Sequence, residues 1–220
     1  MPLEVGSVDS KRALKEFIEF PYSLYRGDPF WVPPLRLAVR ELLNRAKHPF
    51  YINAEAEFFL ARRDGRVVGR IAAILDRNHN KFHEENAGFF GFFESINAPE
   101  VAAALLGAAR KWVSGRGAVL LRGPVNPSTN YECGMLVDGF DSNPMVMMTY
   151  NPRYYPALME EVGLRKAKDL NAYVNTAAEV ELDKIGRVVD RKLAKGGVTV
   201  RPINMKDFEG EVGRIWDVYN

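Results

Sequence analysis

The sequence predicts a layered α/β fold, in which a central sheet is flanked by helices. Two apolar runs with high strand propensity, Phe58 to Ala61 and Val67 to Ile74, lie on either side of Asp64 and Gly65. Asp-Gly between such runs predicts a tight antiparallel hairpin, because its backbone tolerates positive φ. Helical patterns precede the hairpin, and further strand and helix patterns follow it. This mixture of strands and helices predicts the layers.

The N-terminal segment is expected to form one strand and two helices. Leu3 to Val8 reads as the strand, and Asp9 or Ser10 is expected to cap the first helix. Pro21 is expected to end or bend that helix, because proline lacks the N–H that a helix interior uses. After an aromatic and proline-rich loop, a second helix is predicted over roughly residues 35–46.

The region after the hairpin begins with a polar connection, RNHNKFHEENAG. GFFGFFESI follows, and its four phenylalanines favour a strand that is buried on both faces. Asn97 is expected to cap the next helix, with Pro99 and Glu100 in its first turn. The remaining predictions are a strand at 118–122, extended pieces at 135–137 and 145–150, a helix at 151–163 capped by Asn151, and a strand at 169–174.

The chain is expected to contain one domain and the beginning of another. Residues 1–176 are predicted to form the first domain, 177–197 a charged helical linker, and 198–220 the opening strand and helix of a second module. The last segment repeats the first: Val5, Val8, Asp9 and Lys11 align with Val200, Ile203, Asn204 and Lys206. The alternative is that 198–220 is a closing appendage of a single domain.

Composition limits the classes of function. Of the 220 residues 47% are hydrophobic, which is enough for a sizeable core, and the formal net charge is only +2. Such a balanced charge indicates neither nucleic acid nor a membrane surface as a partner. The single cysteine, Cys133, and the lack of a signal-like N-terminus or a long apolar run lead us to expect a cytoplasmic protein.

The predicted order of elements resembles that of the acyl-CoA-dependent N-acyltransferase (GNAT) superfamily. RGDPFWVPPL, KHPFY, GRIAAILDRNHNKFH, GFFGFFE, GPVNPSTNYECGMLVDGF and YNPRYY are together similar to a bacterial family of tandem GNAT-like acetyltransferases. The resemblance implies a mixed, mostly antiparallel sheet that binds acetyl-CoA or another acyl-CoA in a gap between its fourth and fifth strands. It also implies acyl transfer to a small-molecule amine, and a second GNAT-like domain of the same longer chain as a partner.

The site that the resemblance implies for the cofactor lies at the start of the helix after GFFGFFE. A pyrophosphate needs free backbone N–H groups at a helix N-terminus, commonly from a glycine-rich turn. Asn97 and Val101 are the candidate cofactor-binding residues at this place. The segment ESINAPEV has no glycine, Pro99 lacks an N–H, and Glu94 and Glu100 bring negative charge.

The densest polar cluster follows the strand at 118–122, where a cleft is common in open α/β sheets. Glu132 is the candidate general base that takes a proton from an attacking amine. The candidate substrate-binding residues are Asn126, Ser128, Asn130, Tyr131 and Asn151. The alternative is that this loop only builds turns, with asparagine side chains bonded to local backbone.

Two adjacent tyrosines match the last helix of the superfamily. The resemblance implies that Tyr154 or Tyr155 acts as general acid to the departing thiolate, and the alternative is a core position with a polar tip. Tyr25, with Phe30 and Trp31, lines an acceptor pocket in one interpretation and holds the N-terminal helices on the sheet in the other.

Other reactive side chains give weaker signals. His79 and His83 are spaced to share one helical face, with Glu84 beside them, as in a zinc site; solvated or capping histidines are the alternative. Cys133 has no CxxC partner, and no metal is predicted.

Three hypotheses of function follow. The first is an acyl-CoA-dependent N-acyltransferase module that acts on an amine. The second is a non-catalytic GNAT-like module that supports a second domain or binds a small ligand. The third is a metal-dependent hydrolase that uses the histidine pair.

Overall fold

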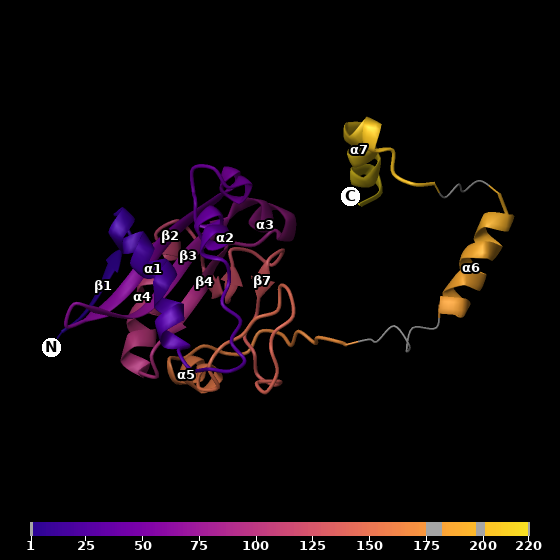
Figure 1. The fold of residues 1–220 in the computed structure, drawn as a ribbon. Coiled ribbons are helices and arrows are strands. Elements are labelled where there is room, and N and C mark those ends of the chain that lie inside the picture. Colours follow the sequence, from indigo (N-terminus) through magenta and orange to yellow (C-terminus); the bar gives the residue numbers. More distant parts are fainter. Residues whose placement is uncertain (1, 175–181, 197–200, 220) are drawn as a thin grey trace. The chain divides into compact units, whose positions relative to one another are not determined.

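The computed structural model describes residues 2–174, 182–196 and 201–219, and the chain divides into unit 1, Met1–Leu170, and unit 2, Asn171–Asn220. Unit 1 contains a five-stranded sheet in the order β1-β2-β3-β4-β5 (Figure 1). Its strands are β1 Leu3–Ser7, β2 Ala54–Arg63, β3 Arg66–Asp76, β4 Ala87–Ser95 and β5 Leu120–Arg122. Neighbouring strands are antiparallel except β4 and β5, which are parallel. The predicted mixed, mostly antiparallel sheet is confirmed.

The predicted hairpin is present and joins β2 to β3. Asp64 and Gly65 form its turn with φ of 54° and 72°. Both residues therefore adopt the left-handed conformation that a tight two-residue turn requires. The strands pair over their full length, with one irregularity next to Ala61.

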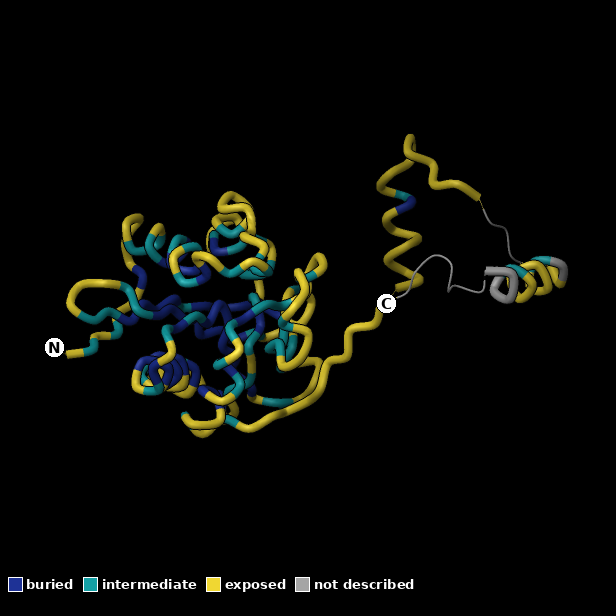
Figure 2. The backbone as a smooth tube through the Cα atoms, turned by 60° about the horizontal axis from the view of Figure 1, so that its bottom comes forward, coloured by how far each residue is buried: buried dark blue, intermediate teal, exposed yellow. Residues whose placement is uncertain are grey.

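Helices cover both faces of the sheet. Helices α1 Lys11–Leu24 and α2 Arg36–Leu42 pack on one face, and α4 Pro99–Ser114 and α5 Tyr155–Glu161 pack on the other. Figure 2 shows the buried strands between two partly exposed layers. Each face has its own apolar cluster, so β3 and β4 are buried almost throughout, as their apolar runs predict.

Several predicted boundaries are wrong. Of the two outcomes expected at Pro21, the helix end is not observed, because α1 runs through Pro21 to Leu24. The predicted polar connection is a short helix, α3 Arg77–His83, because the side chain of Asp76 caps it by accepting from the His79 N–H over 3.0 Å. The second helix is shorter than predicted and is followed by the 3₁₀ turn Pro49–Ile52.

The region after α4 differs most from the prediction. The extended pieces expected at 135–137, 145–150 and 169–174 are not strands, and the described strands here are β6 Val125–Asn126 and β7 Glu132–Cys133. Ala98, not Asn97, occupies the N-cap of α4, and Tyr154, not Asn151, occupies the N-cap of α5.

Unit 2 contains α6 Leu182–Ala194, the 3₁₀ turn Met205–Asp207 and α7 Phe208–Tyr219. The two predicted helices are thus present. The strand predicted from residue 198 falls partly outside the described residues, and 201–204 form none. Within the described ranges, no helix has the length and apolarity needed to cross a membrane.

Candidate functional site

The sheet opens between β4 and β5. The parallel pairing covers only Ala87, Gly88 and Phe89 of β4. Among the described residues, no strand pairs with the second half of β4 on that edge, although β6 lies against it at Gly91. A bulge interrupts the pairing with β3 just there, and Phe92 has a φ of +48°. Bulges of this kind re-aim side chains and are common beside functional sites. Beyond the bulge, Glu94 pairs with Arg70 of β3.

Pro21 creates an acceptor for Arg70. Because proline has no N–H, the carbonyl oxygen of Phe17, one helical turn earlier, lacks its helical donor. Arg70 Nη1 donates a hydrogen bond to that oxygen over 2.7 Å. The guanidinium also lies over the ring of Phe17, 4.9 Å from its centroid. The proline inside α1 therefore helps to hold a buried arginine.

Glu94 is the centre of a buried polar network. Its Oε2 accepts hydrogen bonds from the hydroxyls of Tyr25 and Tyr155, over 2.8 and 2.7 Å. Its Oε1 lies 3.7 Å from Arg70 Nη2, and Arg70 Nε has no partner although it is buried. Burial raises the pKa of Glu94, against the opposing effects of Arg70 and the two tyrosines. Burial also raises the pKa of Tyr25 and of Tyr155 well above the usual range.

The two candidate general acids bind the end of β4. The hydroxyl of Tyr155 accepts a hydrogen bond from the Ser95 N–H over 2.9 Å, and Tyr154 donates to the Ser95 carbonyl oxygen over 2.6 Å. Burial raises the pKa of Tyr154 to about 12. Both hydroxyls are therefore neutral near pH 7, and each already has a protein acceptor for its proton.

Glu132 lies beside this network. It pairs with Asn126 across β6 and β7, and the side chain of Asn126 lowers the pKa of its carboxyl group. Although Glu132 as a residue is exposed, surrounding protein crowds the carboxylate and raises its pKa, while Arg70 lowers it. Glu132 in turn raises the pKa of Glu94, which places the two acids within electrostatic range. The structure thus brings Glu132 near Glu94, whose carboxylate also accepts from Tyr155.

The other predicted substrate-binding residues lie elsewhere or are engaged. Ser128 Oγ accepts from the Asn130 N–H over 3.2 Å, which is a turn interaction. The ring of Tyr131 lies 5.9 Å from that of His48, away from the tyrosine pair. Asn151 is buried, and its Oδ1 accepts from the Leu136 N–H over 2.7 Å.

The aromatic loop after α1 supports Tyr25. Trp31 stacks on the Tyr25 ring with centroids 4.8 Å apart and planes at 11°. The Tyr150 hydroxyl donates to the carboxylate of Asp28 over 2.9 Å, and the same carboxylate accepts from the N–H groups of Phe30 and Trp31. These contacts agree with the interpretation that this loop fastens the N-terminal layer.

The start of α4 does not fit a pyrophosphate. Pro99 has no N–H, the Glu100 N–H is bonded to its own carboxylate, and the Val101 N–H donates to the Ala98 carbonyl oxygen over 3.0 Å. Arg63 Nη2 donates to the Glu100 carboxylate over 2.7 Å. Val101 is fully buried and Asn97 is exposed. The helix dipole is therefore matched by the chain's own acid.

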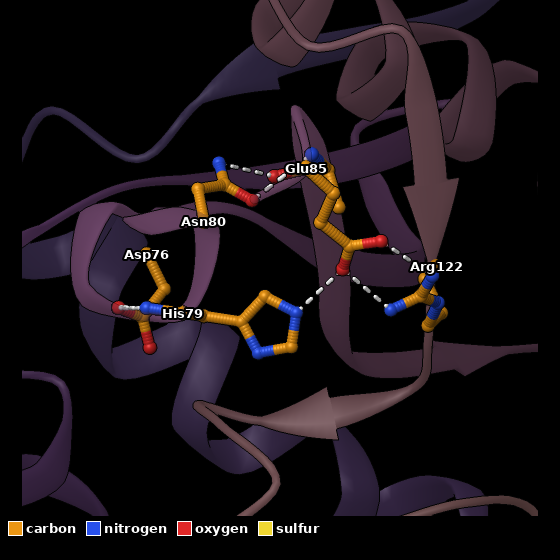
Figure 3. A network of polar contacts seen from close by, with 6 residues as sticks. Asp76, His79, Asn80, Glu85 and Arg122 are labelled. Atoms are coloured by element: carbon orange, nitrogen blue, oxygen red, sulfur yellow. Dashed lines mark hydrogen bonds and ion pairs between the residues drawn. The ribbon is translucent and has the colours of Figure 1, made fainter. Parts of the chain in front are cut away.

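The histidine pair belongs to a different network at the other end of β4. His79 Nε2 lies 2.7 Å from Glu85 Oε1, and Arg122 donates to both oxygens of the same carboxylate over 2.8 and 3.1 Å (Figure 3). The rings of His79 and His83 have centroids 4.3 Å apart. In the described part of the chain, no three His, Cys, Asp or Glu residues form a group that could hold a metal ion.

The motifs in the sequence do not identify Arg70 as part of the site, and they indicate Glu94 only as a charge near the expected cofactor position. A signal was present: both are charged residues inside otherwise apolar strands, in VVGRIAAIL and GFFGFFES. A buried charge needs a partner, so two of opposite sign on adjacent strands predict a pair. The contribution of Tyr25 has no such signal, since it depends on how α1 packs.

Comparison with known proteins gives two curated relatives. "Protein YghO" from Escherichia coli (strain K12) is 35% identical over 212 residues, covering 96% of this chain and 54% of that protein. "Bacterial ceramide synthase" from Caulobacter vibrioides (strain NA1000 / CB15N) is 36% identical over 222 residues, covering 99% of this chain and 57% of that protein. The chain spans about half the length of these relatives. No protein-family model matches it.

The solved structures that this chain resembles are acetyltransferases. An aminoglycoside acetyltransferase from an uncultured soil metagenomic sample, in complex with sisomicin, has a TM-score of 0.47 at 10% identity and covers 80% of this chain and 95% of that one. The structure of AAC(6')-Iy with a bisubstrate analog has a TM-score of 0.47 at 13% sequence identity and covers 80% of this chain and 100% of that one. A tandem GNAT protein from the clavulanic acid biosynthesis pathway has a TM-score of 0.44 at 16% sequence identity and covers 58% of this chain and 38% of that one. Likenesses at this level carry no weight for substrate or activity.

Proposed function

We propose that this chain is a GNAT-like module of an N-acyltransferase, which transfers an acyl group from an acyl-CoA to the amine of a lipid-like acceptor. The thioester bond breaks, an amide bond forms, and CoA leaves as its thiol. One observation carries the proposal: nearly the whole chain aligns, at 36% identity, with a protein named bacterial ceramide synthase. A ceramide is an amide between a fatty acid and an amino alcohol. Its synthesis is therefore an acyl transfer to an amine, the reaction class that the sequence resemblance implies.

The polar network around Glu94 and Glu132 supports a binding site for the amine acceptor of this reaction. Glu132 is the proposed general base, because the residue is exposed and the raised pKa of its carboxyl group makes it a stronger base than an ordinary glutamate. Asn126 is its partner across β6 and β7. Glu94, Tyr154 and Tyr155 are proposed as positioning residues, since they bond to one another or to the backbone of β4.

A second module of the same fold is also proposed, with unit 2 contributing its first helix. The alignment that pairs Val5 with Val200 places Phe17 opposite Val212 and Phe20 opposite Ile215. In α1 the two phenylalanines are buried, whereas in α7 Val212 and Ile215 are exposed. An apolar stripe of this kind needs a sheet to cover it. The greater length of the curated relatives supports this proposal.

The test replaces the aligned part of the Caulobacter protein with this chain and measures amide formation from a long-chain acyl-CoA and a long-chain amino alcohol. We expect product from the chimera, and a fall in kcat of roughly 100-fold for Glu132→Gln, the scale of a lost general base. Asp138→Asn is the matched control, because Asp138 is also exposed on a nearby loop. A chimera that folds by circular dichroism but forms no amide would contradict the proposal.

The second candidate function is a non-catalytic module that supports an active one. The observation that favours it is that the hydroxyls of Tyr154 and Tyr155 already have protein partners. It predicts that Glu132→Gln leaves kcat of the chimera unchanged while destabilising substitutions in unit 1 lower it. The same kinetic measurement therefore separates the two candidates.

A further inference from the structure

We infer that unit 1 closes its own acyl-donor site, so that the CoA portion of the acyl-CoA of the proposed reaction binds outside residues 1–170 and only its thioester comes to Glu132. This inference rests on the proposed function, because it assumes that an acyl-CoA is used. Two places matter: the free edge of β4, where the sheet opens, and the start of α4. In each, groups of this chain make the contacts that a ligand would otherwise make.

The free edge of β4 is occupied along its length. At Gly91 a Cβ would collide with the carbonyl oxygen of Val125, so the segment after β5 lies directly against the strand. The side-chain oxygen of Asn126 accepts the Phe92 N–H over 2.6 Å. Further along, Tyr155 accepts the Ser95 N–H and Tyr154 donates to the Ser95 carbonyl. An extended ligand that added to this edge would have to displace all three side chains.

The start of α4 is occupied by an acid. The carboxylate of Glu100 accepts hydrogen bonds from the backbone N–H of the same residue and from the guanidinium of Arg63. Both interactions lower the pKa of this carboxylate. A pyrophosphate placed there would meet an ionised carboxylate instead of free N–H groups, with repulsion in place of attraction. No glycine-rich turn brings other N–H groups to the place, since ESINAPEV contains none.

Arg63 gives the sharpest test. If a pyrophosphate bound at the start of α4, the Arg63 guanidinium, 2.7 Å from Glu100, would lie beside it. In the chimera, we expect Arg63→Ala to change the KM for acyl-CoA by less than about twofold, a difference well under 1.4 kcal/mol. Arg66→Ala, an exposed arginine of the same hairpin, is the matched control. A tenfold rise in KM with Arg63→Ala alone overturns the inference.

A binding measurement is independent of activity. We expect isothermal titration of the 220-residue chain with CoA to show no saturable binding below about 1 mM. In the chimera with CoA, we expect hydrogen exchange to slow only outside residues 1–170. Micromolar binding by the chain, or slowed exchange at 91–101, overturns the inference. A chimera that forms no amide but shows exchange protection outside this range counts against the proposed function and not against the inference.

Discussion

Arg70 and Glu94 are held in the sheet by groups from both helical layers. Phe17 and Tyr25 come from α1 and its end, and Tyr155 comes from α5. Buried ion pairs add little net stability, because desolvation offsets their attraction, but breaking one leaves an uncompensated charge. The ion pair of Arg70 and Glu94 therefore contributes specificity of position, because it fixes where β3, β4 and the two helical layers meet.

Substitution of Arg70 should cost stability in a pH-dependent way. For Arg70→Met we expect a loss of roughly 3 kcal/mol in the free energy of unfolding near neutral pH, because Glu94 loses its cation. The pKa of Glu94, already raised by burial, should rise further. A folded state that binds the proton more tightly than the unfolded chain loses stability as pH increases, so the deficit should be smaller at about pH 5 than at about pH 8.

Urea unfolding at both pH values measures this effect. Arg66→Met is the control, since Arg66 is exposed at the hairpin turn, and it should change the free energy by less than about 0.5 kcal/mol. Equal losses for Arg70→Met at both pH values would mean that Glu94 does not take up the proton.

At the scale of elements, α3 and β5 are joined by the carboxylate of Glu85. The residue follows α3, accepts from Arg122 at the end of β5 and lies beside His79 of α3. Hydrogen bonds from Arg122 and His79 lower the pKa of Glu85 to about 2. This carboxylate therefore ties the parallel strand, which has only three paired positions, to the rest of the sheet.

Removing Arg122 should change how the free energy of unfolding depends on pH in the acid range. In Arg122→Met the pKa of Glu85 should rise toward the ordinary value of a glutamate side chain. A carboxylate with a lowered folded pKa stabilises the protein above the unfolded value, and this stabilisation disappears as pH falls through the folded one. The variant should thus be less stable than the wild type at neutral pH, with the difference vanishing near pH 2.

Urea unfolding monitored by circular dichroism, repeated at a series of pH values, reads this difference directly. Arg110→Met on the exposed face of α4 provides the comparison. A gap that stays constant down to the lowest pH would show that Arg122 acts through packing and not through Glu85.

At the scale of the whole molecule, unit 1 has its own core. Both apolar clusters are built from residues of unit 1, on the two faces of one sheet. A chain with a complete core can fold as a unit. Unit 2 consists of two described helices and one 3₁₀ turn, without a strand in its described residues.

Shortening the chain tests this division. A chain that ends at Val174 should unfold cooperatively, with a thermal midpoint within about 2 °C of that of the full sequence, because both clusters remain. Differential scanning calorimetry gives the comparison. A midpoint lower by 5 °C or more, or loss of the cooperative transition, would show that unit 1 depends on residues beyond 174.

The sequence by itself determined the fold class, the hairpin and the helix that begins at Pro99. Asp64 and Gly65 specify a turn through their own backbone preferences, and the apolar runs of β3 and β4 specify burial, because both effects are local. Glu132 and Asn126 were also identified from the sequence. Whether they take part in acyl transfer stays a prediction.

Only the tertiary structure decided how the charged and aromatic side chains meet. Pro21 reads locally as a helix end, yet the Arg70 guanidinium replaces its missing donor, and that partner is 53 residues away from Phe17 in sequence. Glu94 and Tyr155 are likewise separated by 61 residues. Hydrogen bonds and ion pairs of buried groups depend on positions in space, which sequence spacing does not encode. The sequence therefore fixes which groups need partners, and packing selects the partners.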